Sequence, residues 1–146
     1  MISIVTLHKN NSRKQQCGNP DNFFKQFIFK INKTMSLVEE FNDYRSRMNE
    51  VILSHDHLPL KRFFSLDHQM YQESALPVKT KELLGLVASM VLRCDDCIKY
   101  HLQKCFENEV STEEIYDVFA IANMVGGSIC IPHTRRAAEF WEELKS

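Results

Sequence analysis

A chain of 146 residues, 44% of them hydrophobic, has the length and the apolar content of one globular domain. Its formal net charge of -1 excludes the basic excess of a typical nucleic-acid-binding protein, and no run of residues approaches the roughly 20 apolar positions that a membrane-spanning helix needs. Only four glycines and four prolines stand among many helix-forming residues, which predicts an all-α fold.

The first 34 residues differ from the rest of the chain in charge and composition. They carry six lysines or arginines and one acidic residue, a net charge of +5, whereas the remainder carries 12 basic and 18 acidic residues, a net charge of -6. A polar stretch from Lys9 to Asn22 lacks an apolar period, which predicts disorder. We therefore expect residues 1–34 to be a disordered or non-native leader, with a transit peptide as the alternative, and a domain at residues 35–146.

After Met35 the apolar residues recur at steps of three and four, as they do in amphipathic helices. The first predicted helix is about 16 residues long, and a second begins at Pro59 and closes near Pro77. The third, residues 78–92, is almost wholly apolar on every face after Glu82, which predicts a buried central helix.

Three further helices are predicted in the second half of the chain. One is expected to begin near Cys94. The next starts with a capping box, in which Ser111 and Glu114 can satisfy each other's backbone amides, and ends at the glycine pair 126–127. Pro132 opens the last helix, because its fixed φ suits a first helical turn.

The segment around Cys94 gathers reactive side chains at a meaningful spacing. Five cysteines, an odd number without the regular spacing of a secreted disulfide scaffold, predict reduced thiols and a cytoplasmic protein. Cys94 and Cys97 are three residues apart, close enough for a disulfide at a helix N-terminus. There the amide dipoles and Arg93 favour a thiolate, whereas Asp95 and Asp96 oppose it.

His101 follows Cys97 by one helical turn, where its imidazole can exchange a proton with the thiol. Two other interpretations of the cysteines stay open, a pair of buried core residues and a zinc site. A fourth zinc ligand at Cys105 would lie roughly 16 Å from Cys94 along a helix, which leaves three ligands and a helping glutamate at most. We expect no cofactor and no metal, and inert core positions for Cys105 and Cys130.

The string from Glu82 to Cys97, followed by His101, resembles the core of the carboxymuconolactone decarboxylase family. The likeness is strongest to its alkylhydroperoxidase D-like branch, whose pattern E-x11-C-x2-C-x3-H is matched at Glu82, Cys94, Cys97 and His101. The resemblance covers about residues 36–145. It implies an all-α, alkylhydroperoxidase D-like orthogonal bundle of about six helices that assembles as a homotrimer or homohexamer.

The resemblance also implies a thiol-dependent peroxidase or disulfide reductase, in which a Glu/His proton relay serves the cysteine pair. Its substrate would be a peroxide or a small disulfide, and a thiol reductant protein or a lipoyl-type dithiol would restore the thiols. We assign attack to Cys97, next to His101, and resolution to Cys94, which we expect to be the more exposed sulfur. One departure is Asp96, where some hydroperoxidase members place a histidine.

Two alternative functions stay open. One is a lyase of the carboxymuconolactone decarboxylase type that uses His101 and Glu82 as acid and base, although the cysteine pair, which members of that branch usually lack, argues against it. The other is a non-enzymatic, redox-sensing oligomeric module, because a fold alone does not fix a function.

The relay imposes a condition on the fold. In one straight helix Glu82 would lie about 18 Å from Cys94 and could not assist it. A break near Arg93 is therefore expected, after which a new helix folds back toward Glu82. Outside this region, His133 follows Pro132 at a helix start, where we expect it to face solvent or to cap the helix.

Overall fold

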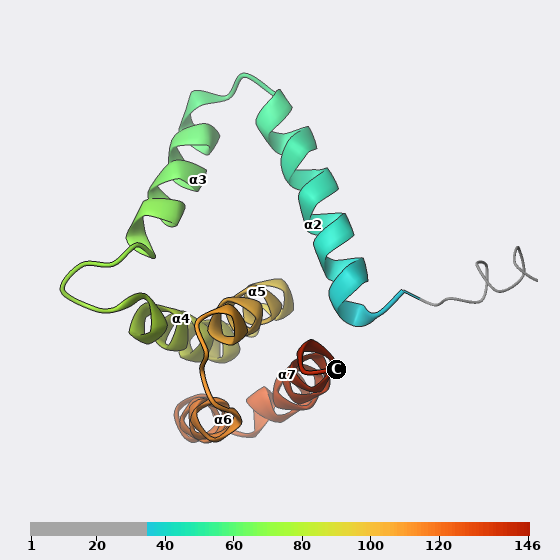
Figure 1. The fold of residues 1–146 in the computed structure, drawn as a ribbon, viewed down its shortest axis with the longest axis vertical. Helices are drawn as coiled ribbons and strands as arrows, with labels where there is room; N and C mark the ends of the chain where they lie inside the picture. The colour runs from blue at the N-terminus through green and yellow to red at the C-terminus, as the bar shows by residue number, and fades with distance from the viewer. Residues whose placement is uncertain (1–34) are drawn as a thin grey trace, which may run out of the picture. The chain divides into compact units, whose positions relative to one another are not determined.

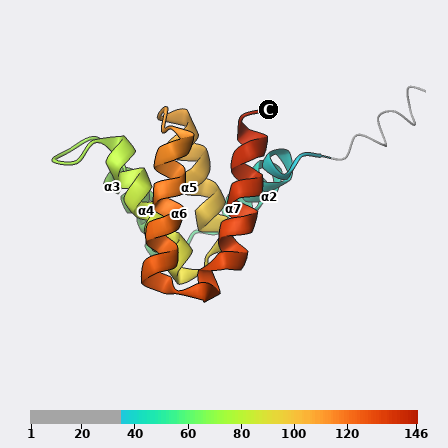
Figure 2. The same cartoon turned by 90° about the horizontal axis from the view of Figure 1, so that it is seen from below.

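The computed structural model of the protein describes residues 35–146, which form one unit (Figures 1 and 2). The leader expected at residues 1–34 lies outside the described residues. The described unit contains α2 (Leu37–Ser54), α3 (Leu58–Met70), α4 (Val78–Leu92), α5 (Asp95–Glu107), α6 (Thr112–Gly126), the 3-10 helix η1 (Ser128–Cys130) and α7 (Ile131–Leu144). With six α-helices and no strand within residues 35–146, the predicted all-α fold is confirmed.

Local sequence signals set most of the helix boundaries. α4 covers the predicted residues 78–92. α6 begins with the predicted capping box, because the Glu114 N–H donates to Ser111 Oγ at 3.2 Å and the Ser111 N–H donates to the Glu114 carboxylate at 2.8 Å. Gly127 ends α6 with a φ of 78°, a conformation that glycine adopts without steric cost.

α3 ends earlier than predicted, at Met70 instead of near Pro77. Lys81 in the first turn of α4 accounts for the difference. Its Nζ donates to the carbonyl of Met70 at 2.7 Å and to that of Gln72 at 2.5 Å. These bonds satisfy carbonyls that a longer helix would pair with its own amides, so the chain can leave the helix there.

The hydrophobic core lies among α4, α5, α6 and α7. α4 packs against α5 and α6, and α5 also packs against α7 (Figure 2). All four helices contribute fully buried large side chains, namely Leu86, Met90, Ile98, Leu102, Ile115, Phe140 and Trp141. The site described below therefore rests on the best-packed pair of helices, α4 and α5.

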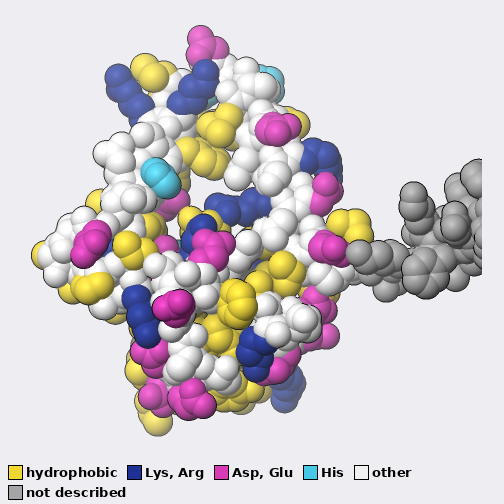
Figure 3. Space-filling view, in the orientation of Figure 1, with side chains coloured by type: hydrophobic (Ala, Val, Ile, Leu, Met, Phe, Trp, Pro, Cys, Tyr) yellow, Lys and Arg dark blue, Asp and Glu magenta, His cyan; other side chains and the backbone are white. Residues whose placement is uncertain are grey.

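α2 and α3 form an arm, residues 37–70, in which the two helices meet at a short connection and diverge from it like the sides of a V (Figure 1). Its contact with the core centres on Phe41, whose ring meets that of Phe140 edge-on with 5.8 Å between centroids. No residue of α3 is buried. The exposed large apolar side chains of α3 are Leu58, Leu60, Phe63, Leu66 and Met70. Hydrophobic side chains are accordingly visible on the surface of the arm in Figure 3.

α4 is central, but it is not buried on every face as predicted. Leu86 and Met90 are completely buried, whereas Leu84 and Leu92 are 56% and 75% exposed. The reason is that α5 and α6 cover two sides of the helix and leave a third side open. Even with these apolar faces, no helix within residues 35–146 has the length and hydropathy that crossing a membrane requires.

Candidate functional site

The two cysteines lie at a sharp turn between α4 and α5. α4 ends at Leu92, and Arg93 takes the left-handed conformation, with φ 62° and ψ 36°. This conformation costs a non-glycine residue on the order of 1 kcal/mol, and the turn is held by the Cys94 N–H, which donates to the Ser89 carbonyl at 3.0 Å. α5 then starts afresh at Asp95. The expected break near Arg93 is confirmed.

Cys94 and Cys97 are joined by a disulfide, with 5.3 Å between their Cα atoms, a usual separation for such a bond. Cys94 is the N-cap of α5, and the Cys97 N–H donates to its Sγ at 3.3 Å. Cys97 is exposed and Cys94 is half-buried. The expectation that Cys94 is the more exposed cysteine is therefore wrong, because the N-cap position turns its side chain back over the first turn of the helix.

One turn further along α5, a buried contact between a carboxylate and a histidine connects α5 to α4. His101 Nδ1 lies 2.7 Å from Glu82 Oε2, and the two side chains are only 9% and 2% exposed. Within residues 35–146 no lysine or arginine forms an ion pair with Glu82. With the carboxylate as acceptor, Nδ1 carries the proton and Nε2 is the imidazole nitrogen left for other chemistry. The turn at Arg93 makes this contact feasible, since it reverses the chain between the two residues.

Two aromatic rings and a thiol surround the buried pair. Tyr71 and Tyr100 lie against the His101 ring with centroid distances of 5.2 and 5.3 Å. Burial, followed by the charge of Glu82, raises the pKa of the Cys105 thiol to about 12, so this thiol stays protonated and unreactive. Cys130 is also buried. The prediction that both are core cysteines is confirmed.

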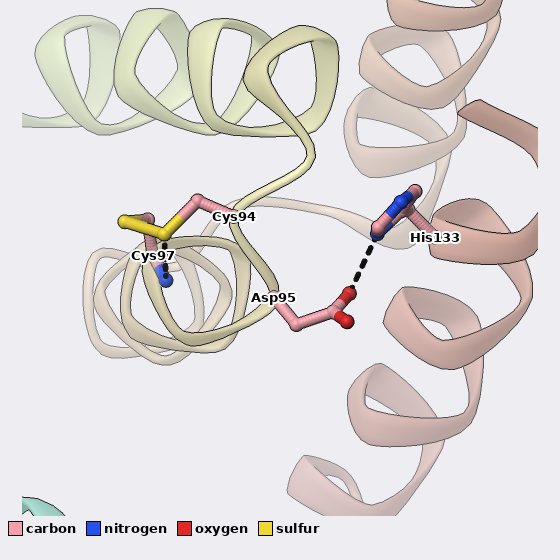
Figure 4. Close-up of a disulfide and its surroundings, with 4 residues drawn as sticks. All are labelled: Cys94, Asp95, Cys97 and His133. Atoms are coloured by element: carbon pink, nitrogen blue, oxygen red, sulfur yellow. Dashed lines mark hydrogen bonds and ion pairs between the residues drawn. A yellow bond between two sulfur atoms is a disulfide. The ribbon is translucent and has the colours of Figure 1, made fainter. Parts of the chain in front are cut away.

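A second carboxylate and histidine meet on the other side of the cysteine turn (Figure 4). Asp95 Oδ1 lies 2.8 Å from His133 Nδ1, and Asp95 Oδ2 lies 3.0 Å from Arg136 of α7. Although burial opposes ionisation, the hydrogen bonds from His133 and Arg136 hold the pKa of Asp95 below its usual value. Asp95 points toward α7 and away from the disulfide, so its charge is neutralised there.

This second cluster was missed by the sequence analysis. His133 does not face solvent as expected, since its side chain is 16% exposed and pairs with Asp95. The available signal was weak. His133 and Arg136 share one face of α7 at a spacing of three, but nothing in the sequence indicates that this face meets Asp95, 38 residues earlier.

The structure brings the four predicted site residues together at the interface of α4 and α5. Cys94 and Cys97 lie at one end of this interface. One turn further along α5, His101 contacts Glu82 of α4. Their chemical roles remain predictions. For the zinc interpretation, the described residues contain no group of three or more His, Cys, Asp or Glu side chains that could hold a metal ion.

Comparisons with known proteins give one consistent family. A sequence profile of the carboxymuconolactone decarboxylase family matches residues 58–140. Two crystal structures of a Thermotoga maritima protein of this family, for which an involvement in an antioxidative response has been suggested, are 56% and 55% identical to this chain. They give TM-scores of 0.71 and 0.70, and the match covers 73% of this chain and 93% and 90% of theirs.

Two more distant relatives add less. A protein of the same family from Legionella pneumophila, solved in its apo form, is 22% identical with a TM-score of 0.55, over 86% of this chain and 96% of its own. That likeness is one of fold alone. An uncharacterised protein of Cupriavidus necator is 25% identical over 75 residues, which is 51% of this chain. The chain spans 66% of that protein, slightly less than two thirds of its length.

Proposed function

The chain belongs to the carboxymuconolactone decarboxylase family, and we propose that it acts there, like the alkylhydroperoxidase D branch, as a thiol-dependent peroxidase or disulfide reductase. The observation that carries the proposal is the pairing of Cys94 with Cys97 at the start of α5, one turn from the buried Glu82–His101 pair. The antioxidative role suggested for the Thermotoga maritima relative supports it.

The proposed oxidation begins at Cys97. Its thiolate attacks one oxygen of a hydroperoxide, so that an S–O bond forms and the O–O bond breaks. The leaving oxygen takes up one proton and departs as an alcohol, or as water when the substrate is hydrogen peroxide. Cys97 suits the attacking role because it is the more exposed of the two cysteines and lies one turn before His101.

Cys94 then resolves the intermediate. Its thiolate attacks the Cys97 sulfenic acid, an S–S bond forms, and the hydroxyl leaves as water after taking up a proton. The Cys97 N–H beside Cys94 Sγ stabilises negative charge on this sulfur, and so does the N-terminus of α5. The same contact makes Cys94 a good leaving group when the disulfide is reduced.

A dithiol reductant returns the pair to its starting state. One thiolate of a thiol protein or a lipoyl-type dithiol attacks the exposed Cys97 sulfur and forms a mixed disulfide, and Cys94 leaves as a thiolate. The second reductant thiolate then displaces Cys97, so the reductant becomes a disulfide and both protein thiols are regenerated. Run in the opposite direction, on a small disulfide, the same exchange makes the protein a disulfide reductase.

Glu82 and His101 are proposed to move the proton in this cycle. Cys97 must lose a proton before it attacks, and the leaving oxygen must gain one. With Nδ1–H held by Glu82, Nε2 of His101 can take the first proton and give back the second. The buried carboxylate would fix the orientation of the imidazole and compensate its transient positive charge.

We also propose that the chain assembles as a homotrimer or homohexamer. The apolar side chains of α3, with Phe63 68% and Met70 66% exposed, and the open face of α4 at Leu84 and Leu92 support it. Apolar surface on this scale is typical of subunit interfaces. Light scattering at micromolar concentration should give a multiple of three chain masses, and a monomer mass would remove the proposal.

The experiment that tests the function is a count of thiols. Cys17, the fifth cysteine, lies outside the described residues and is replaced by serine. The reduced protein is then treated with one equivalent of hydrogen peroxide, quenched with an alkylating agent and analysed by peptide mass mapping. We expect both Cys94 and Cys97 to escape alkylation together, as an intramolecular disulfide, while Cys105 and Cys130 serve as internal controls. A lyase or a scaffold predicts no peroxide-dependent loss of the two thiols, and that result would refute the proposal.

A further inference from the structure

We propose that Tyr71 is a positioning residue of this site, whose hydroxyl and His101 Nε2 together hold one oxygen atom, of a water molecule or of the hydroperoxide, above Gly85. This role rests on the proposed function, since it serves the transfer of a proton between Cys97 and His101. Tyr71 follows α3, and Gly85 and His101 lie on α4 and α5, so the three residues come from three different elements.

Gly85 is where the two polar atoms converge. A Cβ placed on Gly85 would lie 2.8 Å from His101 Nε2 and 2.8 Å from the Tyr71 hydroxyl oxygen. Both are hydrogen-bond distances, so an oxygen just outside that position reaches both groups. A side chain does not fit there, because the same Cβ would also lie 2.5 Å from His101 Cε1.

Glycine at position 85 lowers the stability of α4, and the contacts around it explain why glycine is needed there. Gly85 lies in the middle of α4, next to the buried Leu86, where glycine stabilises a helix less than alanine would. Its φ is not the reason, since Gly127 is the positive-φ glycine of the described residues. What Gly85 provides is room for the imidazole and for the Tyr71 hydroxyl.

The two groups have complementary hydrogen-bonding roles. In the tautomer whose Nδ1–H donates to Glu82, Nε2 is the acceptor of the imidazole. Burial and the charges of Glu82 and Asp67 raise the pKa of Tyr71, so its hydroxyl stays protonated and can donate. One acceptor and one donor match a hydroxyl-type oxygen, which water and a hydroperoxide both offer.

This position can be reached from outside. Tyr71 stands between two cavities, one of about 510 Å³ and one of about 420 Å³. The first is largely apolar and is lined by Gly85 itself, with Leu84 and Ala88. The second is polar and is lined by Glu82. α5 runs back along α4. Its start is fixed where the Cys94 N–H donates to the Ser89 carbonyl, and His101 lies beside Gly85. Cys97 therefore lies along α4 between these two points.

The test compares two tyrosines that both pack on His101. Tyr71→Phe removes the hydroxyl above Gly85, whereas Tyr100→Phe, the matched control, removes one from the other ring that contacts the imidazole. Two quantities are measured, the rate constant of Cys97 oxidation by hydrogen peroxide and the pH profile of Cys97 alkylation in the reduced protein. Tyr71→Phe should slow oxidation roughly three- to tenfold, as expected for one lost hydrogen bond, and Tyr100→Phe should not.

The alkylation profile distinguishes the two oxygen sources. If the oxygen is water, Tyr71→Phe also shifts the alkylation profile to higher pH, without any peroxide present. If it belongs to the hydroperoxide, the profile is unchanged and the concentration of peroxide at half-maximal rate rises. Equal behaviour of Tyr71→Phe and Tyr100→Phe in both measurements would overturn the proposal. Since alkylation needs no peroxidase activity, this failure is separable from failure of the proposed function, which shows in the unmodified chain as no loss of thiols.

A second variant tests the space itself. Gly85→Ala should slow oxidation at least as much as Tyr71→Phe, because its Cβ displaces His101 and the bound oxygen. Gly126→Ala is its control, since a Cβ there would collide with Cys130 Sγ in the core and leave the site untouched. A folded Gly85→Ala protein that reacts as fast as the unmodified chain would overturn the proposal.

Discussion

Two carboxylate–histidine pairs flank the cysteine turn, with almost the same contact distance and different surroundings. Glu82–His101 is closed off from solvent, and no lysine or arginine of residues 35–146 forms an ion pair with it. Asp95–His133 is partly exposed and shares its carboxylate with Arg136. The difference teaches that the pairing alone does not indicate a catalytic role. We therefore propose that Arg136 makes the Asp95 pair a structural contact, whereas His101 is available to exchange protons.

Energetics point the same way. A buried carboxylate beside a histidine is weak evidence of stabilisation, because removing a charged group from water costs about as much as its new contact returns. Keeping Glu82 and His101 inside the core is therefore more easily explained by function than by stability. Asp95 and Arg136, at 41% and 48% side-chain exposure, incur a smaller desolvation cost and hold α5 against α7.

The largest expected effect is a difference in peroxide consumption between variants of the two cysteines, each of which lies near one of these pairs. Cys97 is one turn from His101, and Cys94 directly precedes Asp95. If the cysteine near the buried pair attacks the peroxide, Cys97→Ser should lose peroxide consumption. Cys94→Ser should consume one equivalent and stop at a sulfenic acid, which mass spectrometry detects.

The converse result would break the comparison. Peroxide consumption that survives in Cys97→Ser and is lost in Cys94→Ser would assign attack to the N-cap sulfur, on the side of Asp95. Cys105→Ser is the control for loss of a thiol as such, because Cys105 is buried and protonated and should have no effect on the rate.

The next effect in size contrasts the two histidines. His101→Ala and Glu82→Gln should slow thiol oxidation by roughly 10²-fold if proton transfer limits the rate, whereas His133→Ala should change it less than about threefold. The deficit of the first two variants should shrink at alkaline pH, where the thiol ionises without a base. Stopped-flow oxidation across a pH series measures both. Equal losses for His101→Ala and His133→Ala would remove the distinction between the pairs.

Features governed by short-range signals were predictable from the sequence. The bounds of α4 and the Ser111 capping box depend on neighbouring residues, and both appear where predicted. The early end of α3 was not predictable, because it depends on Lys81, eleven residues after Met70.

The candidate site was predictable only in part, for a related reason. The proximity of Glu82 to His101, 19 residues apart, came from the family resemblance and the required break at Arg93. Asp95 and His133 are 38 residues apart and match no motif, so nothing in the sequence indicated their contact. Exposure of the arm also escaped prediction, because an apolar stripe indicates that a helix face will be covered without indicating by what.

A smaller effect, on the alkylation rate of Cys94, is expected when Arg136, the cation beside Asp95, is removed. Arg136→Ala leaves the Asp95 charge without its cation next to Cys94, and a nearby carboxylate disfavours a thiolate. Alkylation of Cys94 at neutral pH should slow a few-fold, with recovery at higher pH, since one unit in pKa corresponds to about tenfold. Arg135→Ala is the matched control, because Arg135 is an exposed neighbour on α7. Identical slowing in both variants would show a general loss of positive charge instead.

The smallest expected effect is on stability, and its pH dependence follows from Asp95. Its pKa is lower in the folded chain than the ordinary value of about 4, so the carboxylate stabilises the fold above that value, and the stabilisation is lost as the pH falls through the folded pKa. Asp95→Asn should therefore lower the free energy of unfolding at pH 7 by about 0.5–1 kcal/mol, the range of a partly exposed ion pair, and by progressively less in acid, as the carboxylate becomes protonated. Urea unfolding at neutral and at acid pH measures the difference. Asp96→Asn is the matched control, because Asp96 is the next acid in the first turn of α5 and shares the helix dipole without a bond to α7. If both variants lose the same free energy at both pH values, the helix dipole accounts for the effect, and Asp95–His133–Arg136 is not the contact that holds α5 to α7.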